Sequence, residues 1–456
     1  MSFDSLLALG ALDGRYRSKI EPLAGVMSEF GLMRSRVEVE CRWFIALAEC
    51  PQIEELEKLS PPQRTAVERV FKDFDLASAQ RIKKLEATTN HDVKSVEYFV
   101  KEQLANIEGL ASHIEFVHFA CTSEDINNLS HGLMLMRGRE VLLPVMNELI
   151  RAIEELALRT ADLAMLSRTH GQTASPTTLG KELRNVSERL VRQARQFAAL
   201  DTLGKMNGAV GNFNAHRVAF PEVDWVGLSE QFVADLGMIS NPHTTQIEPH
   251  DYMAEWFHNL CRFNQVLLDF DRDTWSYISL DYFRQRKVEG ETGSSTMPHK
   301  VNPIDFENSE GNLGVANALL EHMAAKLPVS RWQRDLSDST VIRNIGSAFG
   351  HCLLAYRATL KGLSRLEVNE PVITADLEES WEVLAEAVQT VMRRHGGVEP
   401  YERLKALTRG RRLDRALYRE ILNELNLPPD TVAELEALTP SSYIGLAPEL
   451  ARRGTV

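Results

Sequence analysis

Apolar residues recur at helical spacing along five long stretches, and this pattern limits the possible folds more than any other feature of the chain. In the stretch 142–163 they alternate at spacings of three and four residues, as in the buried seam of a coiled coil. The other stretches lie within 179–197, 252–270, 315–327 and 342–363, with few strand-like alternations between them. The sequence therefore predicts an all-α fold built on a bundle of long helices.

Three details of this bundle can be predicted. Pro144 lacks an amide hydrogen and fits the first turn of a helix, so the first long helix is expected to begin near residue 142. Residues 206–220 and 236–248 contain several Gly and Asn residues and are expected to form loops or small hairpins. The helix at 252–270 is apolar over a wide arc, which suits either an interface between subunits or a deeply buried central helix.

Interruptions of the helical pattern predict three domains. Gly and polar residues break the pattern near 110–115, and a segment ending in Pro371 breaks it again. The prediction is an N-terminal helical domain at 1–114, a central long-helix domain at 115–365 and a C-terminal helical domain at 366–456.

Charge and cysteine content restrict the function classes. The chain has 51 basic and 64 acidic residues, a net charge of −13, which disfavours general nucleic-acid binding. Five scattered cysteines without a CxxC pair indicate reduced thiols rather than disulfides or a zinc site. The N-terminus does not resemble a signal peptide, and no apolar run is long enough to span a membrane. We therefore expect a cytoplasmic protein without nucleic-acid or membrane partners.

Polar residues gather at the expected starts of helices, in segments 88–92, 122–125, 250–251 and 337–340. Helix N-termini offer unpaired backbone amides and a partial positive charge, which favour carboxylates and phosphates. Ordinary helix caps explain any one of these segments taken alone.

Two further segments are harder to explain as structural. In SRTHGQ (167–172), hydroxyl, guanidinium and amide groups surround a histidine, an arrangement suited to acid–base catalysis. Segment 290–303 has glycines at one end and prolines at the other, as expected of a lid that closes over substrate, with residues 288–300 mobile until substrate binds. A flexible linker is the alternative. A serine in this lid could act as a base; a nucleophilic serine would require a GxSxG motif, which the chain lacks.

The lid sequence GSSTMPHKVNP (293–303) resembles the signature loop of the fumarase/aspartase superfamily, whose members eliminate fumarate from succinyl-type substrates. The similarity runs from DGRY (13–16) to PYERLKALTRG (400–410) and favours the longer bacterial members that act on succinylated purine nucleotides. The supporting segments are TTNHDVK (88–94), TSEDINN (122–128), SRTHGQ (167–172), TTQIEPHD (244–251) and SRWQRDLSDSTVIRN (330–344).

This resemblance implies an all-α, three-domain homotetramer whose active sites are shared between subunits. The implied reaction is acid–base β-elimination of fumarate from N6-succinyl-AMP and from succinyl-aminoimidazole carboxamide ribotide in purine nucleotide biosynthesis, with no cofactor and no metal. By the same resemblance, His170 is the general acid that protonates the departing nitrogen. Ser294 is the base that removes the Cβ proton.

The resemblance also implies a set of substrate-binding residues. Shorter family members have arginine where this chain has Val301 and Asn308, so phosphate binding is expected to depend more on Arg15 and Arg334. The full set is Arg15, Tyr16, Asn90, His91, Asp92, Thr122, Ser123, Gln246, Ser295, Lys300, Asn302, Asn308, Arg334, Ser339, Thr340 and Arg343.

Three alternatives remain at this stage. Argininosuccinate lyase or fumarase would share the lid but not TTNHDVK or the arginine-rich segment 331–343. A catalytically silent protein on the same scaffold would have no need of both His170 and the Gly-Ser-Ser lid. A coiled-coil scaffold would explain the heptads but not the lid.

Overall fold

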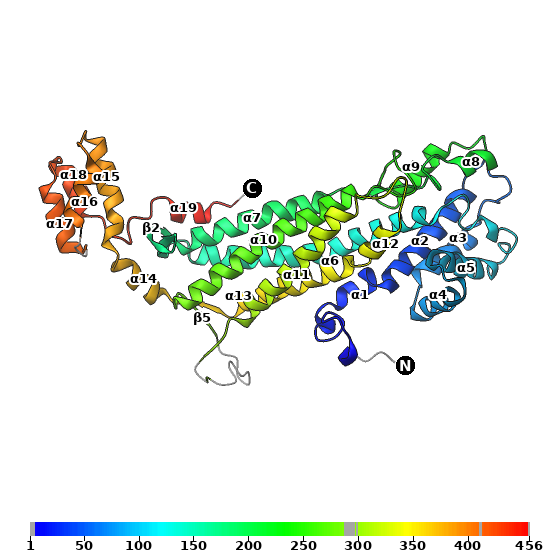
Figure 1. Ribbon diagram of the computed structural model, residues 1–456, viewed down its shortest axis with the longest axis horizontal. Helices are drawn as coiled ribbons and strands as arrows, with labels where there is room; N and C mark the ends of the chain where they lie inside the picture. Colours follow the sequence, from blue (N-terminus) through cyan, green and yellow to red (C-terminus); the bar gives the residue numbers. More distant parts are fainter. Residues whose placement is uncertain (1–4, 287–296, 298–299, 410–412, 455–456) are drawn as a thin grey trace. The chain divides into compact units, whose positions relative to one another are not determined.

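Helices make up most of the described structure, which confirms the all-α class predicted from the apolar spacing (Figure 1). The computed structural model describes residues 5–286, 297, 300–409 and 413–454. The chain divides into two units. Unit 1 comprises Met1–Val145, Gln193–Asn264 and Gly311–Ala355, and unit 2 comprises Met146–Arg192, Gln265–Glu310 and Tyr356–Val456. The three-domain division and the tetramer stay predictions.

Five long helices contribute a segment to each unit. They are α6 (Ser123–Arg159), α7 (Leu179–Ala199), α10 (Asp251–Ser279), α11 (Ile304–Lys326) and α13 (Ile345–Ser364). Among the described residues, no helix combines the length and apolar character needed to cross a bilayer.

Shorter elements complete each unit. Those of unit 1 are η1 (Ser5–Leu7), η2 (Arg17–Lys19), α1 (Glu21–Met27), α2 (Glu29–Ala48), α3 (Pro61–Lys72), α4 (Leu76–Thr89), α5 (Asp92–Ala105), η3 (Ile114–Phe116), β3 (Leu203–Gly204), α8 (Asn214–Ala219), α9 (Trp225–Asp235), β4 (Ile239–Ser240) and α12 (Ser337–Ile342). Those of unit 2 are β1 (Ala164–Thr169), β2 (Gln172–Thr178), β5 (Phe283–Gln285), β6 (Leu366–Val368), α14 (Glu370–Glu378), η4 (Trp381–Leu384), α15 (Ala385–Arg394), α16 (Pro400–Thr408), α17 (Arg415–Glu424), α18 (Pro429–Glu436) and α19 (Ala447–Arg452).

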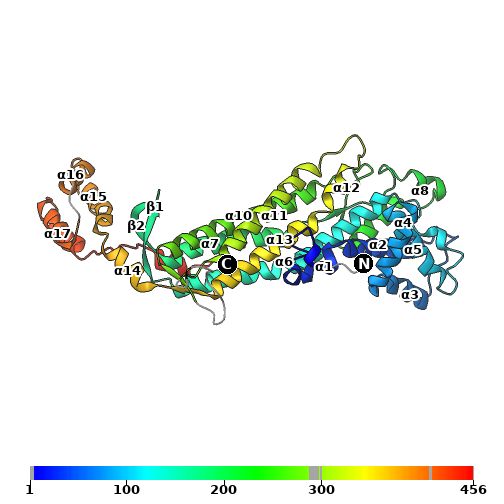
Figure 2. The same ribbon diagram turned by 60° about the horizontal axis from the view of Figure 1, so that its bottom comes forward.

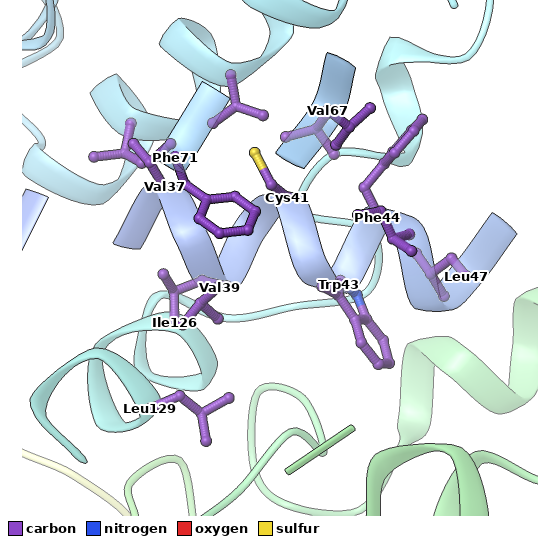
Figure 3. Packing of buried hydrophobic residues seen from close by; sticks show 14 of the residues in the cluster. Val37, Val39, Cys41, Trp43, Phe44, Leu47, Val67, Phe71, Ile126 and Leu129 are labelled. Atoms are coloured by element: carbon purple, nitrogen blue, oxygen red, sulfur yellow. The ribbon is translucent and has the colours of Figure 1, made fainter. Parts of the chain in front are cut away.

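The N-terminal part of unit 1 packs around α2. This helix begins after Ser28, whose hydroxyl accepts a hydrogen bond from the Gly31 amide at 3.3 Å and so caps the first turn. Trp43 is 1% exposed, and most of α2 is buried on several faces. Figure 3 shows the neighbours that enclose it, which include Val67 and Phe71 of α3 and Ile126 and Leu129 of α6.

The bundle segment of α10 in unit 1 is buried within a single chain. Trp256 and Phe263 are fully buried, and the Trp256 ring packs against Phe197 of α7 with centroids 5.4 Å apart. Asn264 Nδ2 donates to Asn317 Oδ1 at 2.9 Å, which links α10 to α11. Of the two alternatives for the wide apolar arc at 252–270, the structure shows the buried central helix.

In unit 2 the same helices meet through buried polar contacts. The Thr359 hydroxyl of α13 donates to Asp271 Oδ1 of α10 at 3.0 Å and lies 2.8 Å from the Ser309 hydroxyl of α11. Burial raises the pKa of Asp271 well above its usual value, although these hydroxyls oppose the shift. A separate apolar core joins Leu166 of β1 to the C-terminal helices.

Three local features differ from the expectations in whole or in part. The long helix α6 begins at Ser123 and passes through Pro144, so it does not begin near residue 142. Leu142 and Met146 on either side are fully buried, and this packing compensates for the hydrogen bond that proline cannot donate. Residues 206–220 form a loop followed by helix α8, and 236–248 is mostly loop, with the two-residue strand β4 paired in parallel to β3. The loop alternative is therefore confirmed for most of both segments, and neither is a hairpin. A hairpin forms at 164–178, between the helices predicted at 142–163 and 179–197, where no strand was predicted.

Candidate active site

A cavity of about 350 Å³ in unit 1 is lined mainly by polar and charged side chains. This volume lies within the usual range for small-molecule sites, roughly 300–1,000 Å³. The corner between α4 and α5, the start of α6, the loop before α12 and α12 itself all contribute. Seven of the predicted substrate-binding residues line the cavity together: Asn90, His91, Asp92, Ser123, Arg334, Ser339 and Arg343.

Cap geometry at the α4–α5 corner places three of these residues. Asn90 ends α4 in the left-handed conformation (φ 49°), which asparagine adopts more readily than most residues. His91 caps α5, and its Nδ1 accepts a hydrogen bond from the Lys94 amide at 3.2 Å. Asp92 is then the first residue of α5, where the helix dipole favours a negative charge.

Asp92 lies between two guanidinium groups. Its Oδ2 accepts hydrogen bonds from Arg36 Nη2 at 2.8 Å and from Arg343 Nη2 at 2.9 Å. Burial alone would raise the carboxyl pKa, but the two arginines outweigh it and hold the pKa of Asp92 well below its usual range. Asp92 is therefore ionised at neutral pH and fixes one edge of each arginine.

Arg334 occupies a second part of the cavity. Its Nη2 lies 3.0 Å from Glu124 Oε1 and donates to the Ser339 hydroxyl at 3.2 Å, while Nη1 donates to Gln246 Oε1 at 3.2 Å. Within the described residues, the buried Nε of Arg334 has no hydrogen-bond partner. Because Nε is buried, a bound anion would be met by the Nη1 hydrogen that Gln246 does not use.

His250 lies at the buried side of the cavity, in a left-handed conformation (φ 65°) that is uncommon for histidine. Its amide donates to Glu248 Oε2 at 2.7 Å, and its Nε2 lies 3.7 Å from Asp338 Oδ2. Burial and the nearby Arg36 lower the pKa of a second lining histidine, His131, to about 3. His131 is therefore neutral throughout the physiological range.

Five predicted residues of unit 1 lie outside the lining of this cavity: Arg15, Tyr16, Thr122, Gln246 and Thr340. Gln246 lines a neighbouring cavity of about 370 Å³, which shares Arg334 with the first. Arg15 is exposed, with its guanidinium carbon 5.9 Å from the centroid of the Tyr16 ring. The Thr122 amide donates to Asp125 Oδ2 at 2.7 Å, and Thr340 is exposed on α12.

The remaining described site residues belong to unit 2. His170 and Gly171 form the two-residue turn of the β1–β2 hairpin, with φ of 54° and 71°. Positive φ at both positions defines a type I′ turn, the type that suits two-residue hairpins. Among the described residues, Lys300 and Asn302 precede α11 and Asn308 lies within it. Ser294, Ser295 and most of the predicted lid lie outside the described residues.

Sequence comparison identifies the family. The family described as "Lyase" matches residues 14–317, and the family described as "Adenylosuccinate lyase C-terminal" matches residues 330–444. The adenylosuccinate lyase of Haemophilus influenzae is 55% identical over 454 residues, which cover 99% of this chain and 100% of that protein. The adenylosuccinate lyase of Escherichia coli is 55% identical over 448 residues, 98% of each chain. The chain belongs to the adenylosuccinate lyase family.

The fold is also found in solved structures of other proteins. The 3-carboxy-cis,cis-muconate lactonizing enzyme from Pseudomonas putida superimposes with a TM-score of 0.74 at 21% identity, covering 94% of this chain and 95% of that one. This similarity confirms the fumarase/aspartase-like fold. The adenylosuccinate lyase assignment depends instead on the relatives with 55% identity.

The cavity of this adenylosuccinate lyase family member places donors for an anion beside a group of residues with metal-like spacing. Glu124, His250 and Asp338 each offer one ligand atom within 4.8 Å of the others, a spacing compatible with a metal site. However, Arg334 already contacts Glu124, and Arg36 and Arg343 add positive charge to the same cavity. The same lining also carries Glu86, Asp92 and Asp338, so what it offers a carboxylate or phosphate group is guanidinium donors rather than a net positive charge.

Sequence reasoning missed several lining residues. Glu124 and Asn127 lie in the motif TSEDINN, and His250 and Asp338 lie in polar helix starts. All four therefore lie in segments that the sequence singles out, although none of them was predicted as a site residue. Arg36 carried no comparable signal, because it is one of six charged residues in α2 and the sequence does not distinguish it from the others. Only the structure does so: Arg36 is 4% exposed, and a buried guanidinium needs a partner.

Proposed function

We propose that this chain cleaves N6-succinyl-AMP into AMP and fumarate by acid–base β-elimination. The main support is the cavity that Arg36, Arg334 and Arg343 help to line, because it brings together seven of the predicted substrate-binding residues. The chain that holds this cavity is 55% identical to two bacterial adenylosuccinate lyases. The proposal includes the corresponding cleavage of succinyl-aminoimidazole carboxamide ribotide in purine biosynthesis, and the cytoplasm as the compartment.

Arg343 and Arg334 are the proposed phosphate ligands, together with the Ser339 hydroxyl, which lies 3.2 Å from Arg334 Nη2. A guanidinium group offers planar paired donors that match two phosphate oxygens. The side chain of Arg343 is 49% exposed, so an entering ligand can reach it, whereas that of Arg334 is 15% exposed. Asp92 accepts a hydrogen bond from Arg343, and the Glu124 carboxyl lies 3.0 Å from Arg334, so one edge of each arginine is held and other guanidinium hydrogens are left for a ligand.

His170 is the proposed general acid and Ser294 the proposed base. Ser294 removes the Cβ proton, and the electron pair of that C–H bond forms the carbon–carbon double bond of fumarate. The C–N bond breaks, its electrons remain on nitrogen, and His170 supplies the proton that completes AMP. Lys300, Asn302, Ser295, Thr122 and Ser123 are proposed to stabilise the carboxylate charge that develops before the bond breaks.

A homotetramer with active sites shared between subunits is part of the proposal. The family resemblance supports this assembly. The wide apolar arc of α10 gives it no support, because that face is already buried within one chain and needs no second subunit to cover it. Exposed apolar residues on the bundle helices, such as Val315 at 47% and Trp275 at 48%, are available for subunit contact.

Direct turnover of N6-succinyl-AMP tests the reaction. The purified chain is mixed with this substrate, and fumarate and AMP are separated and quantified over time. The proposal predicts equal amounts of both products without added metal or cofactor, including after treatment with EDTA. Absence of fumarate, in a preparation whose thermal transition shows a folded protein, would contradict the proposal.

A further inference from the structure

The β1–β2 hairpin presents His170 at an exposed tip. At the base of the hairpin, Met165 and Leu166 of β1 are buried, and Leu166 joins the apolar core of the C-terminal helices. Residues 168–173 around the tip are exposed. Apolar packing therefore fixes the base but not the tip, and a short isolated hairpin is only marginally stable in water. Other contacts are needed to hold the tip in one position.

Arg168 supplies such a contact two residues before His170. Its Nη1 donates to the Tyr282 hydroxyl at 3.0 Å, and its Nη2 donates to Asp376 Oδ2 at 2.6 Å. The Tyr282 hydroxyl also donates to Asp376 Oδ2, which closes a three-membered network. Arg168 in addition lies over the Tyr282 ring, 5.5 Å from its centroid.

Both partners of Arg168 are themselves well anchored. Tyr282 is 2% exposed, and its ring stacks on Tyr277 with centroids 5.9 Å apart. Asp376 lies on α14, which packs beside β1 (Figure 2). Burial opposes ionisation of Asp376, but the hydrogen bonds from Arg168 and Tyr282 outweigh it and lower the pKa of this carboxyl. The network is therefore charged and intact at neutral pH.

The second strand has its own contact with the C-terminal helices. The Ser175 hydroxyl donates to Glu386 Oε2 of α15, and the Tyr443 hydroxyl donates to the same oxygen at 3.1 Å. Ser175 lies nearer the base of the hairpin than Arg168 does. Among the side-chain hydrogen bonds that join the described hairpin to other elements, those of Arg168 therefore lie closest to the tip.

We propose that Arg168, Tyr282 and Asp376 are positioning residues that hold the hairpin tip so that His170 can reach the departing nitrogen of the substrate. This inference depends on the proposed role of His170 as general acid. Two strand residues span about 7 Å, so a small rotation of the strand at Arg168 moves the tip appreciably. Displacement of a catalytic group by about 1 Å can reduce turnover by roughly a hundredfold.

Removal of the charge on Asp376 tests the inference. We expect Asp376→Asn to lower kcat about tenfold or more, with KM changed less than twofold, because the variant leaves the nucleotide cavity untouched. Tyr282→Phe keeps the ring and removes only the hydroxyl, so a smaller fall of roughly threefold is expected. This milder variant also tests the inference if Asp376→Asn does not fold.

A matched control and a double-mutant cycle separate positioning from general destabilisation. Arg189 and Asp269 form a comparable ion pair of unit 2 at 2.7 Å, away from the hairpin, and Asp269→Asn should leave kcat within twofold. In a His170→Ala background, Asp376→Asn should lower the residual rate less than twofold, because there is no imidazole left to position.

Each result has one meaning. Wild-type kcat in both Asp376→Asn and Tyr282→Phe, an equal loss in Asp269→Asn, or an undiminished loss in the His170→Ala background would overturn the inference. Wild-type kcat in His170→Ala alone would overturn the proposed acid role, and the inference with it. Loss of turnover in His170→Ala with full turnover in both network variants would overturn the inference only.

Discussion

Arg36 is a buried cation whose stability depends on one carboxylate. Asp92→Ala would leave its guanidinium at 4% exposure without its nearest counter-charge. Breaking a fully buried ion pair costs roughly 3–5 kcal/mol of unfolding free energy. Because the Asp92 side chain is itself 29% exposed, we expect Asp92→Ala to lower the free energy of unfolding by only about 2 kcal/mol. Calorimetry should show a melting temperature lower by a few degrees.

The control for this variant is an ion pair at the surface. Asp162 pairs with Arg452, with side-chain exposures of 74% and 49%. Asp162→Ala should leave the melting temperature nearly unchanged, because exposed pairs contribute little. Equal losses in the two variants would mean that Arg36 does not depend on Asp92.

The same carboxylate gives stability a defined pH dependence. The pKa of Asp92 is lower in the folded chain than in the unfolded one, so its contribution is complete above the unfolded value of about 4. As the pH falls below 4 towards the folded pKa, the contribution is lost. We expect the gap in melting temperature between wild type and Asp92→Asn to be constant from pH 7 to 5 and to narrow below pH 4. A gap that widens on acidification would contradict this assignment.

Polar helix starts predicted part of the site because their chemistry is local. Asp92 and Ser339 lie in segments that the sequence alone singles out, and both line the cavity. Arg36 could not be found in this way, because its role depends on a partner 56 positions along the chain. Which polar segments meet is decided by tertiary packing, which apolar spacing does not encode.

At the scale of elements, the β1–β2 hairpin is the clearest departure from the predicted structure. The heptad spacing continues to Leu163, yet α6 ends at Arg159, where the Thr160 hydroxyl bonds the Leu156 carbonyl at 2.8 Å. The two-residue His170–Gly171 turn then sets the register of the strands. Apolar periodicity predicted the long helices well because they bury continuous stripes, whereas a half-exposed hairpin leaves a weak pattern.

Gly171→Ala tests the importance of this turn. Gly171 has φ of 71°, and nothing lies within 4 Å of an added Cβ, so the cost is backbone strain rather than steric overlap. We expect the strain to lower the free energy of unfolding by about 1 kcal/mol, with a small change in melting temperature. Because the tip would change conformation to relieve the strain, kcat should fall severalfold. Gly454, which also has open space around a Cβ and lacks a positive φ, provides the control. Unchanged kcat in Gly171→Ala would show that the turn tolerates rearrangement.

At the scale of the whole molecule, shared active sites predict complementation. If His170 and Ser294 of one site come from different chains, mixing the inactive His170→Ala and Ser294→Ala variants should restore part of the activity after subunit exchange. Sedimentation should show tetramers at micromolar concentration. A fully active monomer, or no recovery after exchange has been demonstrated, would mean that each site is built within one chain.

The acid–base assignment is best tested by measuring kcat of His170→Ala with N6-succinyl-AMP. The exposed turn lies outside the apolar core, so the variant should keep the wild-type melting temperature. Loss of a general acid should lower kcat by about 10²–10⁴-fold, with a much smaller change in KM. A folded His170→Ala variant that releases fumarate at the wild-type rate would contradict the account.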